Sequence, residues 1–187
     1  MPQFMPQPTL YAAQHDSPVG PLYLVSDATH LRGLWMVGQK YFAQGLSVTP
    51  QQHALPPVLA QARAWLDAYF AGQRPDVGDL PLAPQGSAFR QAVWALLRAI
   101  PYGQTTTYGD LARALAAQSG QTRVSAQAVG GAVGHNPLSI VVPCHRVLGR
   151  GGSLTGYAGG LDKKVKLLTL EGVDAARWRV PTRGSAL

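Results

Sequence analysis

The only cysteine of this 187-residue chain is followed directly by a histidine, in the string Val141–Val142–Pro143–Cys144–His145–Arg146–Val147. A cysteine thiolate is a strong nucleophile, and a nearby imidazole can take the proton of the thiol. A single cysteine is, however, more often a small buried hydrophobic residue. The pair alone therefore leaves two interpretations open, a reactive nucleophile or a packing residue.

The residues around this pair predict a rigid support for it. Residues 140–142 form an apolar run that we interpret as a short buried strand. Pro143 ends the strand because proline cannot extend a hydrogen-bonded ladder. Cys144 is therefore expected just past a strand end. We interpret Arg146 as an anchor between a sheet and a helix rather than as a catalytic group.

Short motifs on both sides of the pair favour the reactive interpretation. They are Ala128–Val129–Gly130–Gly131–Ala132, Asn136–Pro137, Thr155–Gly156–Tyr157–Ala158–Gly159–Gly160 and Leu167–Leu168–Thr169–Leu170–Glu171–Gly172. Together with the Pro-Cys-His-Arg-Val string, this pattern resembles the O6-alkylguanine-DNA alkyltransferases, which take an alkyl group from damaged guanine onto their own cysteine. The resemblance is close over residues 87–172 and looser over residues 1–80.

The resemblance implies a role for five catalytic residues. Cys144 would accept the alkyl group, and His145 would take the thiol proton. Because successive residues of an extended chain point to opposite faces, a water molecule would bridge the two. Glu171 would orient the imidazole, Asn136 would brace the turn around the thiol, and Tyr108 would crowd the 3′ phosphate and donate to the departing guanine. From residue type alone, Asn136 would be a helix-ending residue and Tyr108 a packing residue.

The resemblance also implies which residues bind the alkylated base. Val133 and Tyr157 would line the alkyl pocket, and the backbone at Val147 and Ala158 would bind the edge of the base. Residues 149–160 are rich in glycine and are expected to form a mobile lid over this pocket.

The first part of the chain predicts a small sheet and one helix. Strand patterns occupy residues 10–25, interrupted by a Pro-Val-Gly turn, and residues 31–36, which favours an antiparallel sheet. A helix is predicted from Pro56–Pro57 to Phe70, ended by Gly72. Residues 72–85 are rich in proline and glycine and indicate a linker. The resemblance implies a ribonuclease H-like domain here, to which we assign a structural role.

The second part of the chain predicts helices. Ser87 is expected to cap one helix, and Thr107 with Asp110 forms a capping box for another over residues 108–117. A further helix is predicted from about Thr122 to Gly134, which completes a helix-turn-helix. The predicted fold class is α/β (α+β), with an N-terminal sheet domain over residues 1–84. A mainly helical C-terminal domain over residues 85–187 would bind DNA and carry out the transfer.

The last of these predicted helices is unusually rich in very small residues. Ala128, Gly130 and Gly131 lie in it, although glycine in a helix costs about 1 kcal/mol relative to alanine. Either close approach of a DNA groove or tight packing between helices would explain them; the resemblance implies the minor groove. Gln127 stands where the family has an arginine that replaces the flipped base. Arg123, four residues earlier on the same predicted helix, would supply the missing charge.

The basic residues are unevenly distributed. The net charge is +7, of which residues 1–84 contribute 4 − 5 = −1 and residues 85–187 contribute 12 − 4 = +8. Such an asymmetry is typical of a phosphate-binding face, although a generally basic surface is the alternative. We expect double-stranded DNA containing O6-alkylguanine as the partner of a monomeric protein.

Composition excludes several other classes of protein. One cysteine is too few for an internal disulfide or a multi-cysteine zinc site, so we expect no metal and no cofactor. No apolar run is long enough to span a membrane, and Met1–Pro2–Gln3–Phe4–Met5–Pro6 does not have the pattern of a signal peptide. We therefore expect no membrane partner and a cytoplasmic location.

Three functions follow from these observations. The first is a single-turnover DNA repair protein that transfers an alkyl group from O6-alkylguanine to Cys144. The second is a non-catalytic lesion sensor, although the presence of the cysteine argues against it. The third is a cysteine hydrolase, which would need a histidine from elsewhere in the chain and would leave the helix-turn-helix unexplained.

Overall fold

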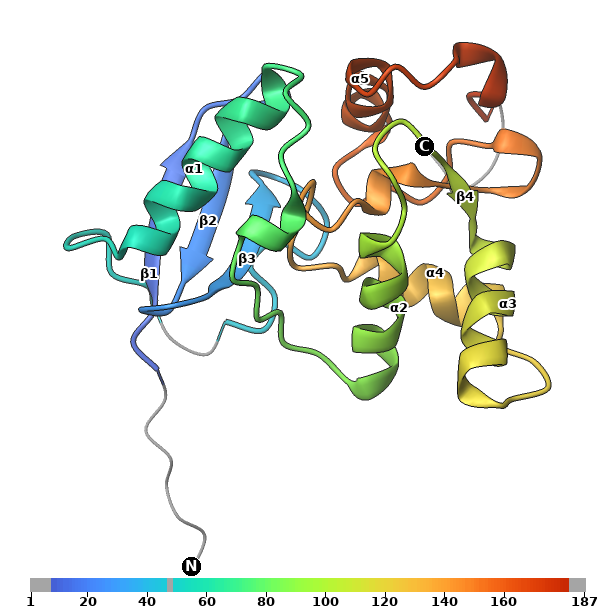
Figure 1. The fold of residues 1–187 in the computed structure, drawn as a ribbon, viewed down its shortest axis with the longest axis horizontal. Helices are drawn as coiled ribbons and strands as arrows, with labels where there is room; N and C mark the ends of the chain where they lie inside the picture. Colours follow the sequence, from blue (N-terminus) through green and yellow to red (C-terminus); the bar gives the residue numbers. More distant parts are fainter. Residues whose placement is uncertain (1–7, 47–48, 182–187) are drawn as a thin grey trace, which may run out of the picture.

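The structure, a computed structural model, describes residues 8–46 and 49–181. A small sheet with one helix forms the first part of the chain, and a group of helices forms the second (Figure 1). The expectation about a signal peptide concerns residues 1–6, which lie outside the described range. None of the helices in residues 8–46 and 49–181 combines the length and the apolar content that crossing a lipid bilayer requires.

The sheet is antiparallel, as the sequence predicts. Its strands are β1 (Tyr11–His15), β2 (Leu22–Ser26) and β3 (Leu31–Met36), in the order β1-β2-β3, with Leu24 opposite both Ala13 and Leu34. Helix α1 (Pro57–Phe70) covers one face of this sheet (Figure 1). Proline at the start of α1 is favoured because its fixed backbone angle suits a helix and its missing N–H has no partner to lose.

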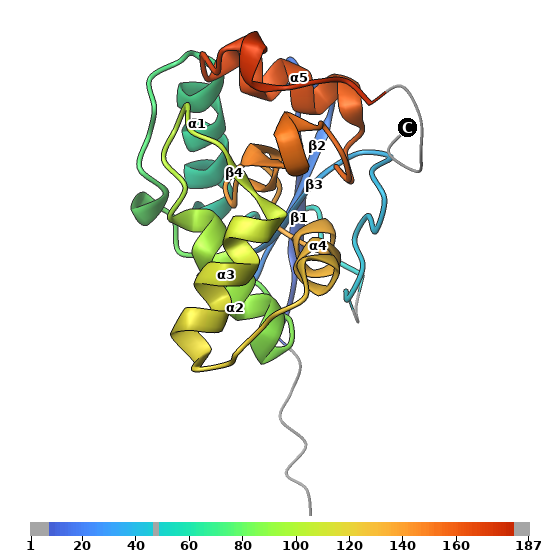
Figure 2. The same cartoon turned by 90° about the vertical axis from the view of Figure 1, so that its right-hand side faces the viewer.

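Up to residue 181, where the described part of the chain ends, the helical part contains four α-helices and one short parallel strand pair. The helices are α2 (Ala88–Arg98), α3 (Tyr108–Ser119), α4 (Ala126–Gly134) and α5 (Leu161–Leu170), and the strands are β4 (Thr106–Thr107) and β5 (Val147–Leu148). Single 3-10 turns lie at Val77–Asp79, Cys144–Arg146, Arg150–Gly152 and Ala175–Arg177. In Figure 2, α2, α3 and α4 form one group, while α5 lies with α1 at the other end of the molecule.

The predicted capping residues begin their helices as expected. The Ser87 hydroxyl accepts a hydrogen bond from the Arg90 N–H. The Thr107 hydroxyl accepts one from the Asp110 N–H at 3.1 Å and donates one to the Asp110 carboxylate at 2.6 Å. These bonds satisfy N–H groups that have no partner inside the helix. Because Tyr108 is the first residue of α3, the same cap fixes the position of a predicted site residue.

The predicted start of the second helix of the helix-turn-helix was wrong. Helix α4 begins at Ala126 rather than near Thr122, because Ser125 is its capping residue and accepts a hydrogen bond from the Ala128 N–H. The preceding helix ends at Gly120, whose φ of 66° is left-handed and favours glycine. Arg123 therefore lies in an exposed loop before α4 and does not share a helical face with Gln127.

The predicted strand over residues 140–142 was also wrong. This segment is a buried turn, in which the Val142 N–H donates to the Leu138 carbonyl at 2.8 Å and Ile140 has a φ of 71°. Leu138 makes one bridge to Leu34 of β3, and the chain then turns away instead of extending the ladder. Burial was predicted correctly, since Ile140 is 1% exposed, but apolar residues indicate burial and do not by themselves indicate an extended chain.

The two parts of the chain share one apolar core. Its largest cluster contains Leu24 and Leu66 from the first part together with Leu97 and Ile140 from the second. The edge of β3 joins the parts as well: the Leu34 N–H donates to the Pro137 carbonyl, and the Leu34 carbonyl accepts from the Ser139 N–H. The segment that leads to Cys144 is therefore held against the sheet on one side and against the helices on the other.

Candidate active site

Cys144 begins the 3-10 turn Cys144–Arg146 directly after the buried turn at residues 140–142. Its N–H donates to the Val142 carbonyl at 2.8 Å, and the residue is 6% exposed. The apolar side chains of the preceding turn pack in the core, so the position of the thiol is fixed by packing as well as by hydrogen bonds.

Asn136 braces this turn through both ends of its side-chain amide. Its Oδ1 accepts from the Leu138 N–H at 3.0 Å, and its Nδ2 donates to the Val142 carbonyl at 2.7 Å. The same Nδ2 lies 3.2 Å from the Sγ of Cys144. Asn136 thus contacts the thiol directly while holding the backbone on which the thiol is mounted.

His145 and Glu171 form a fully buried pair. The His145 Nε2 lies 2.7 Å from Glu171 Oε1. Burial would raise the pKa of Glu171, but the hydrogen bonds and charges of His145 and Arg146 outweigh burial and hold that pKa well below its ordinary range. Because an ionised carboxylate only accepts hydrogen bonds, Nε2 carries the proton of the neutral imidazole.

The other ring nitrogen of His145 is consequently a proton acceptor. Burial lowers the pKa of His145, and the hydrogen bond and charge of Glu171 oppose this effect. Nδ1 is buried and has no hydrogen-bond partner among the described residues. A neutral imidazole with an unoccupied lone pair is the form that a general base requires.

Arg146 connects Glu171 to the end of α2. Its Nε and Nη2 donate to the two oxygens of Glu171 at 2.8 and 2.9 Å, and its Nη1 donates to the Ile100 carbonyl at 2.6 Å. The predicted anchor role included a sheet, whereas the partners of this guanidinium are a helix end and a carboxylate. The paired geometry fixes the plane of the Glu171 carboxylate.

Lys164 is a buried residue of this site that was not predicted from the sequence. It is fully buried on α5, and its Nζ donates to the Val147 carbonyl at 2.6 Å and to the Thr155 carbonyl at 3.2 Å. Burial lowers the pKa of Lys164 to about 8, and the nearby Cys144 opposes this effect. A sequence signal existed, because Lys164 lies three and four residues from Leu161 and Leu168, on the apolar face of its helix.

The thiol is subject to opposing effects. Burial raises the pKa of Cys144, while the hydrogen bond from Asn136 and the positive charge of Lys164 lower it. The net direction is upward, so the free protein holds mostly a protonated thiol at neutral pH. A base is therefore needed before this sulfur can attack.

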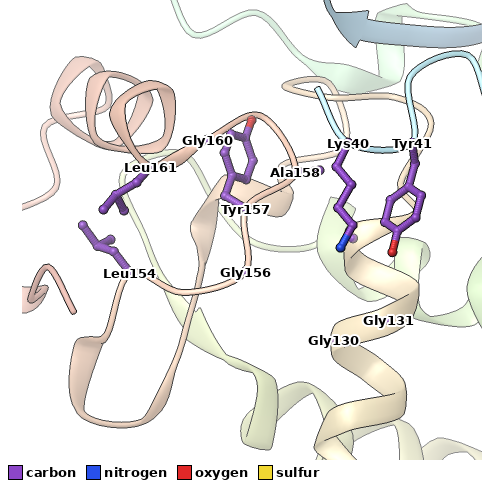
Figure 3. A pocket seen from close by; sticks show the side chains of 11 residues that line it. Lys40, Tyr41, Gly130, Gly131, Leu154, Gly156, Tyr157, Ala158, Gly160 and Leu161 are labelled. Carbon is purple, nitrogen blue, oxygen red and sulfur yellow. The ribbon is translucent and has the colours of Figure 1, made fainter. Parts of the chain in front are cut away.

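A cavity of about 310 Å³ lies between α4 and the segment 154–161 (Figure 3). It is lined by Lys40, Tyr41, Gly130, Gly131, Gly134, Leu154, Gly156, Tyr157, Ala158, Gly160 and Leu161. The side chains of Lys40 and Tyr41 point toward α4 (Figure 3), where the Tyr41 ring stacks on His135 at the end of the helix. The Lys40 N–H donates to the Ala158 carbonyl. Of the predicted base-binding residues, Tyr157 and Ala158 line the cavity.

The remaining predicted residues lie around this cavity. Val133 and Val147 are buried and are not among its lining residues. The Tyr108 hydroxyl donates to the Thr155 carbonyl at 3.1 Å, and burial, with a contribution from Cys144, raises the pKa of Tyr108. Gln127 and Ala128, like Gly131, lie on the exposed face of α4.

Fold and site together define a class of protein. A thiol next to an imidazole–carboxylate pair, on a chain that carries a helix-turn-helix, is the arrangement of a cysteine-based protein that acts on DNA. The chain belongs to the 6-O-methylguanine DNA methyltransferase family: residues 9–84 match its ribonuclease-like domain and residues 88–173 its DNA binding domain.

Individual relatives agree with this assignment. A methylated-DNA–protein-cysteine methyltransferase of Haemophilus influenzae is 40% identical over 164 residues, which cover 87% of this chain and 86% of that protein. Its counterpart in Mycobacterium tuberculosis is 44% identical over 156 residues, covering 83% and 88%. A crystal structure of Mycobacterium tuberculosis OGT in complex with DNA matches with a TM-score of 0.74 and 40% identity, covering 89% of this chain and 96% of that one. The predicted family and fold class are confirmed.

Proposed function

We propose that this protein is a methylated-DNA–protein-cysteine methyltransferase that moves the alkyl group of O6-alkylguanine in DNA irreversibly to the Sγ of Cys144. The observation that carries the proposal is the contact of Asn136 with the only thiol, next to the buried His145–Glu171 pair. DNA is the partner, in agreement with the family. We further propose that the protein acts as a monomer and in a reducing compartment, where the thiol stays free.

In the proposed reaction, a bond forms between Cys144 Sγ and the alkyl carbon while the bond from that carbon to guanine O6 breaks. His145 Nδ1 takes the thiol proton through a bridging water molecule. Glu171 stabilises the imidazolium that results. Tyr108 donates a proton to the departing guanine. The imidazolium of His145 then releases its proton to water and Tyr108 regains one from water, so that the net change is one proton lost by the thiol and one gained by the base. Because the thioether is stable, each molecule would react once.

The cavity beside α4 is the proposed entrance for the nucleotide. A base inside the duplex cannot reach a buried thiol, so the alkylated nucleotide must leave the stack. Tyr157 and Ala158 line the cavity, whereas Cys144 does not, so the segment 154–161 would shift when the base enters. The incoming guanine would compete with the Thr155 carbonyl for the hydroxyl of Tyr108.

The exposed face of α4 is the proposed surface for the minor groove. Gln127 would fill the space that the flipped base leaves, and Ala128 and Gly131 would allow close approach of the groove. Arg123 would contribute an ordinary phosphate contact from the loop before α4. This revises the expectation that Arg123 and Gln127 act from one helical face.

The decisive experiment is incubation of the full chain with a duplex that contains one O6-methylguanine, followed by peptide mass analysis. We expect one added methyl group, on Cys144, and no turnover beyond one equivalent. Cys144→Ala is expected to acquire no methyl group while binding the same duplex with similar affinity. Binding without any added mass in the wild type would indicate a lesion sensor, and a methyl group elsewhere would contradict the role of Cys144.

A further inference from the structure

A tyrosine of the first part of the chain reaches the proposed catalytic pair. The Tyr69 hydroxyl, on α1, donates to Glu171 Oε1 at 2.7 Å, across a sequence separation of 102 residues. The residue is 1% exposed, and its ring stacks on Trp65 and meets Tyr102 edge-on. The sheet and α1, to which the sequence analysis assigns only structural work, therefore contact the carboxylate that holds His145.

The Glu171 carboxylate accepts hydrogen bonds from four residues. Oε1 accepts from Tyr69, His145 Nε2 and Arg146 Nη2, and Oε2 accepts from Arg146 Nε and from the Gly103 N–H. The two parallel bonds from Arg146 already fix the orientation of the carboxylate. The Tyr69 hydroxyl is thus not needed to aim Glu171 at His145, and its effect must be mainly electrostatic.

Tyr69 shares one oxygen with His145. When His145 takes the thiol proton, the imidazolium is stabilised by the negative charge on Oε1. The Tyr69 hydroxyl donates to the same oxygen and withdraws part of this negative charge. The effect is considerable because hydrogen bonds to charged groups are stronger than those between neutral groups. We propose that Tyr69 acts through Glu171 to set the pH range in which His145 can serve as a base; this inference rests on the proposed function.

The groups around the pair are compatible with this role. Burial and the neighbouring Glu171 raise the pKa of Tyr69 far above neutrality, so its hydroxyl stays a donor throughout the working range. The other titratable or charged groups that act on His145 and Glu171 are Arg146, Lys164, Tyr102 and Tyr157. Among these groups, Arg146 is the other hydrogen-bond donor to the oxygen that faces His145.

The test compares the pH dependence of methyl transfer in three proteins: the wild type, Tyr69→Phe and Tyr102→Phe. Tyr102 is the matched control, because it belongs to the same aromatic cluster but its hydroxyl donates to the Leu170 carbonyl. Single-turnover rates are measured with saturating O6-methylguanine duplex, after thermal melting has confirmed that each variant is folded.

Without the Tyr69 hydroxyl, Glu171 stabilises the imidazolium more strongly, and His145 stays protonated to higher pH. We expect the acid limb of the rate profile of Tyr69→Phe to move up by about one pH unit, the order of effect of one hydrogen bond to a charged group. The rate on the plateau should change little, since Arg146 still orients the carboxylate. Tyr102→Phe should follow the wild type.

A second comparison, between Glu171→Gln and the double variant with Tyr69→Phe, tests the inference even if Tyr69→Phe lowers the folding stability. If Tyr69 acts through Glu171, adding Tyr69→Phe to Glu171→Gln should move the midpoint no further than Glu171→Gln alone. The inference is overturned by a profile of Tyr69→Phe that superimposes on the wild type, by equal shifts in both tyrosine variants, or by a rate loss at all pH values with an unchanged midpoint. In each of these cases, methyl transfer by the wild type would still support the proposed function. A wild type that transfers nothing overturns both.

Discussion

A buried lysine next to a buried thiol is an unusual combination of side chains. Taking an ammonium group out of water is costly unless it is hydrogen-bonded, and Lys164 meets this requirement with the Val147 and Thr155 carbonyls. These bonds leave its positive charge near Cys144, where it favours the thiolate. We interpret Lys164 as the group that partly offsets the effect of burial on the nucleophile.

The effect of the Lys164 charge on the rate of methyl transfer is predicted to depend on pH. At pH 7 the wild-type ammonium is charged, since the pKa of Lys164 is lowered only to about 8. Lys164→Met should therefore transfer methyl about tenfold more slowly than the wild type at pH 7, which corresponds to about one unit of thiol pKa. As pH rises through about 8, the wild type loses the charge, and the ratio of the two rates should shrink towards one.

Lys166→Met is the control for this comparison, because Lys166 is exposed on the same helix. Single-turnover rates from pH 6 to 10 provide the measurement. A ratio that stays constant over this range would mean that Lys164 acts through packing rather than through its charge.

At the scale of elements, the surroundings of α4 distinguish between two explanations for its small residues, tight packing between helices and close approach of a DNA groove. A methyl group added at Gly131 would meet no atom within 4 Å, and one added at Gly130 would lie 3.8 Å from the Tyr108 ring, an ordinary contact. Packing inside the protein therefore does not require glycine at either position. Close approach of an external partner remains as the explanation, which supports the proposed groove-facing role.

This interpretation is tested with Gly131→Leu. Folding stability should stay equal or rise by up to about 1 kcal/mol, since leucine is the better helix former and the site is open. Affinity for duplex DNA should fall by about tenfold or more, because the side chain would enter the space of the groove. Urea unfolding and fluorescence anisotropy provide the two measurements. Ala117→Leu, on the exposed face of α3, is the control and should leave affinity unchanged.

At the scale of the whole molecule, charge is segregated. Residues 85–187 carry +8 and residues 1–84 carry −1, from the counts given above. Arg146 and Lys164 are buried, so phosphate contacts would have to come from other basic residues of the second part. Neutralised phosphates release counterions, which makes binding dependent on salt.

Affinity for undamaged duplex should consequently fall about a hundredfold or more between 50 and 200 mM salt, the behaviour of a protein with at least four to five phosphate contacts. Titrations at several salt concentrations measure the slope of log affinity against log salt. A flat dependence would contradict groove binding by the basic part of the chain.

The sequence allowed the local elements of this fold to be predicted, because their signals are local. Strand-forming stretches separated by a turn indicated the sheet, and the capping side chains of Ser87 and Thr107 indicated where two helices begin. The errors arose where signals competed. The helix predicted from about Thr122 begins only after the true cap, Ser125, and at residues 140–142 an apolar run concealed a turn.

The site was predictable only where it follows short motifs. His145, Glu171 and Asn136 stand in such motifs, and the structure brings them together around the thiol. Tyr69 was not predictable, because its contact with Glu171 spans 102 residues and no local pattern encodes such a pairing. Lys164 was missed for a different reason, since a lysine in a helix is normally assigned to the solvent-exposed face.

The position of Glu171 late in the chain also has a consequence for synthesis on the ribosome. The chain emerges from its first residue onward, so α1 and Cys144 leave the ribosome before Glu171 does. Until Glu171 arrives, the imidazole of His145 lacks its carboxylate, and the guanidinium of Arg146 lacks its counter-ion. A nascent chain therefore carries an unactivated sulfur, and an unfinished chain that ends before residue 171 would compete poorly for the lesions that the finished protein repairs.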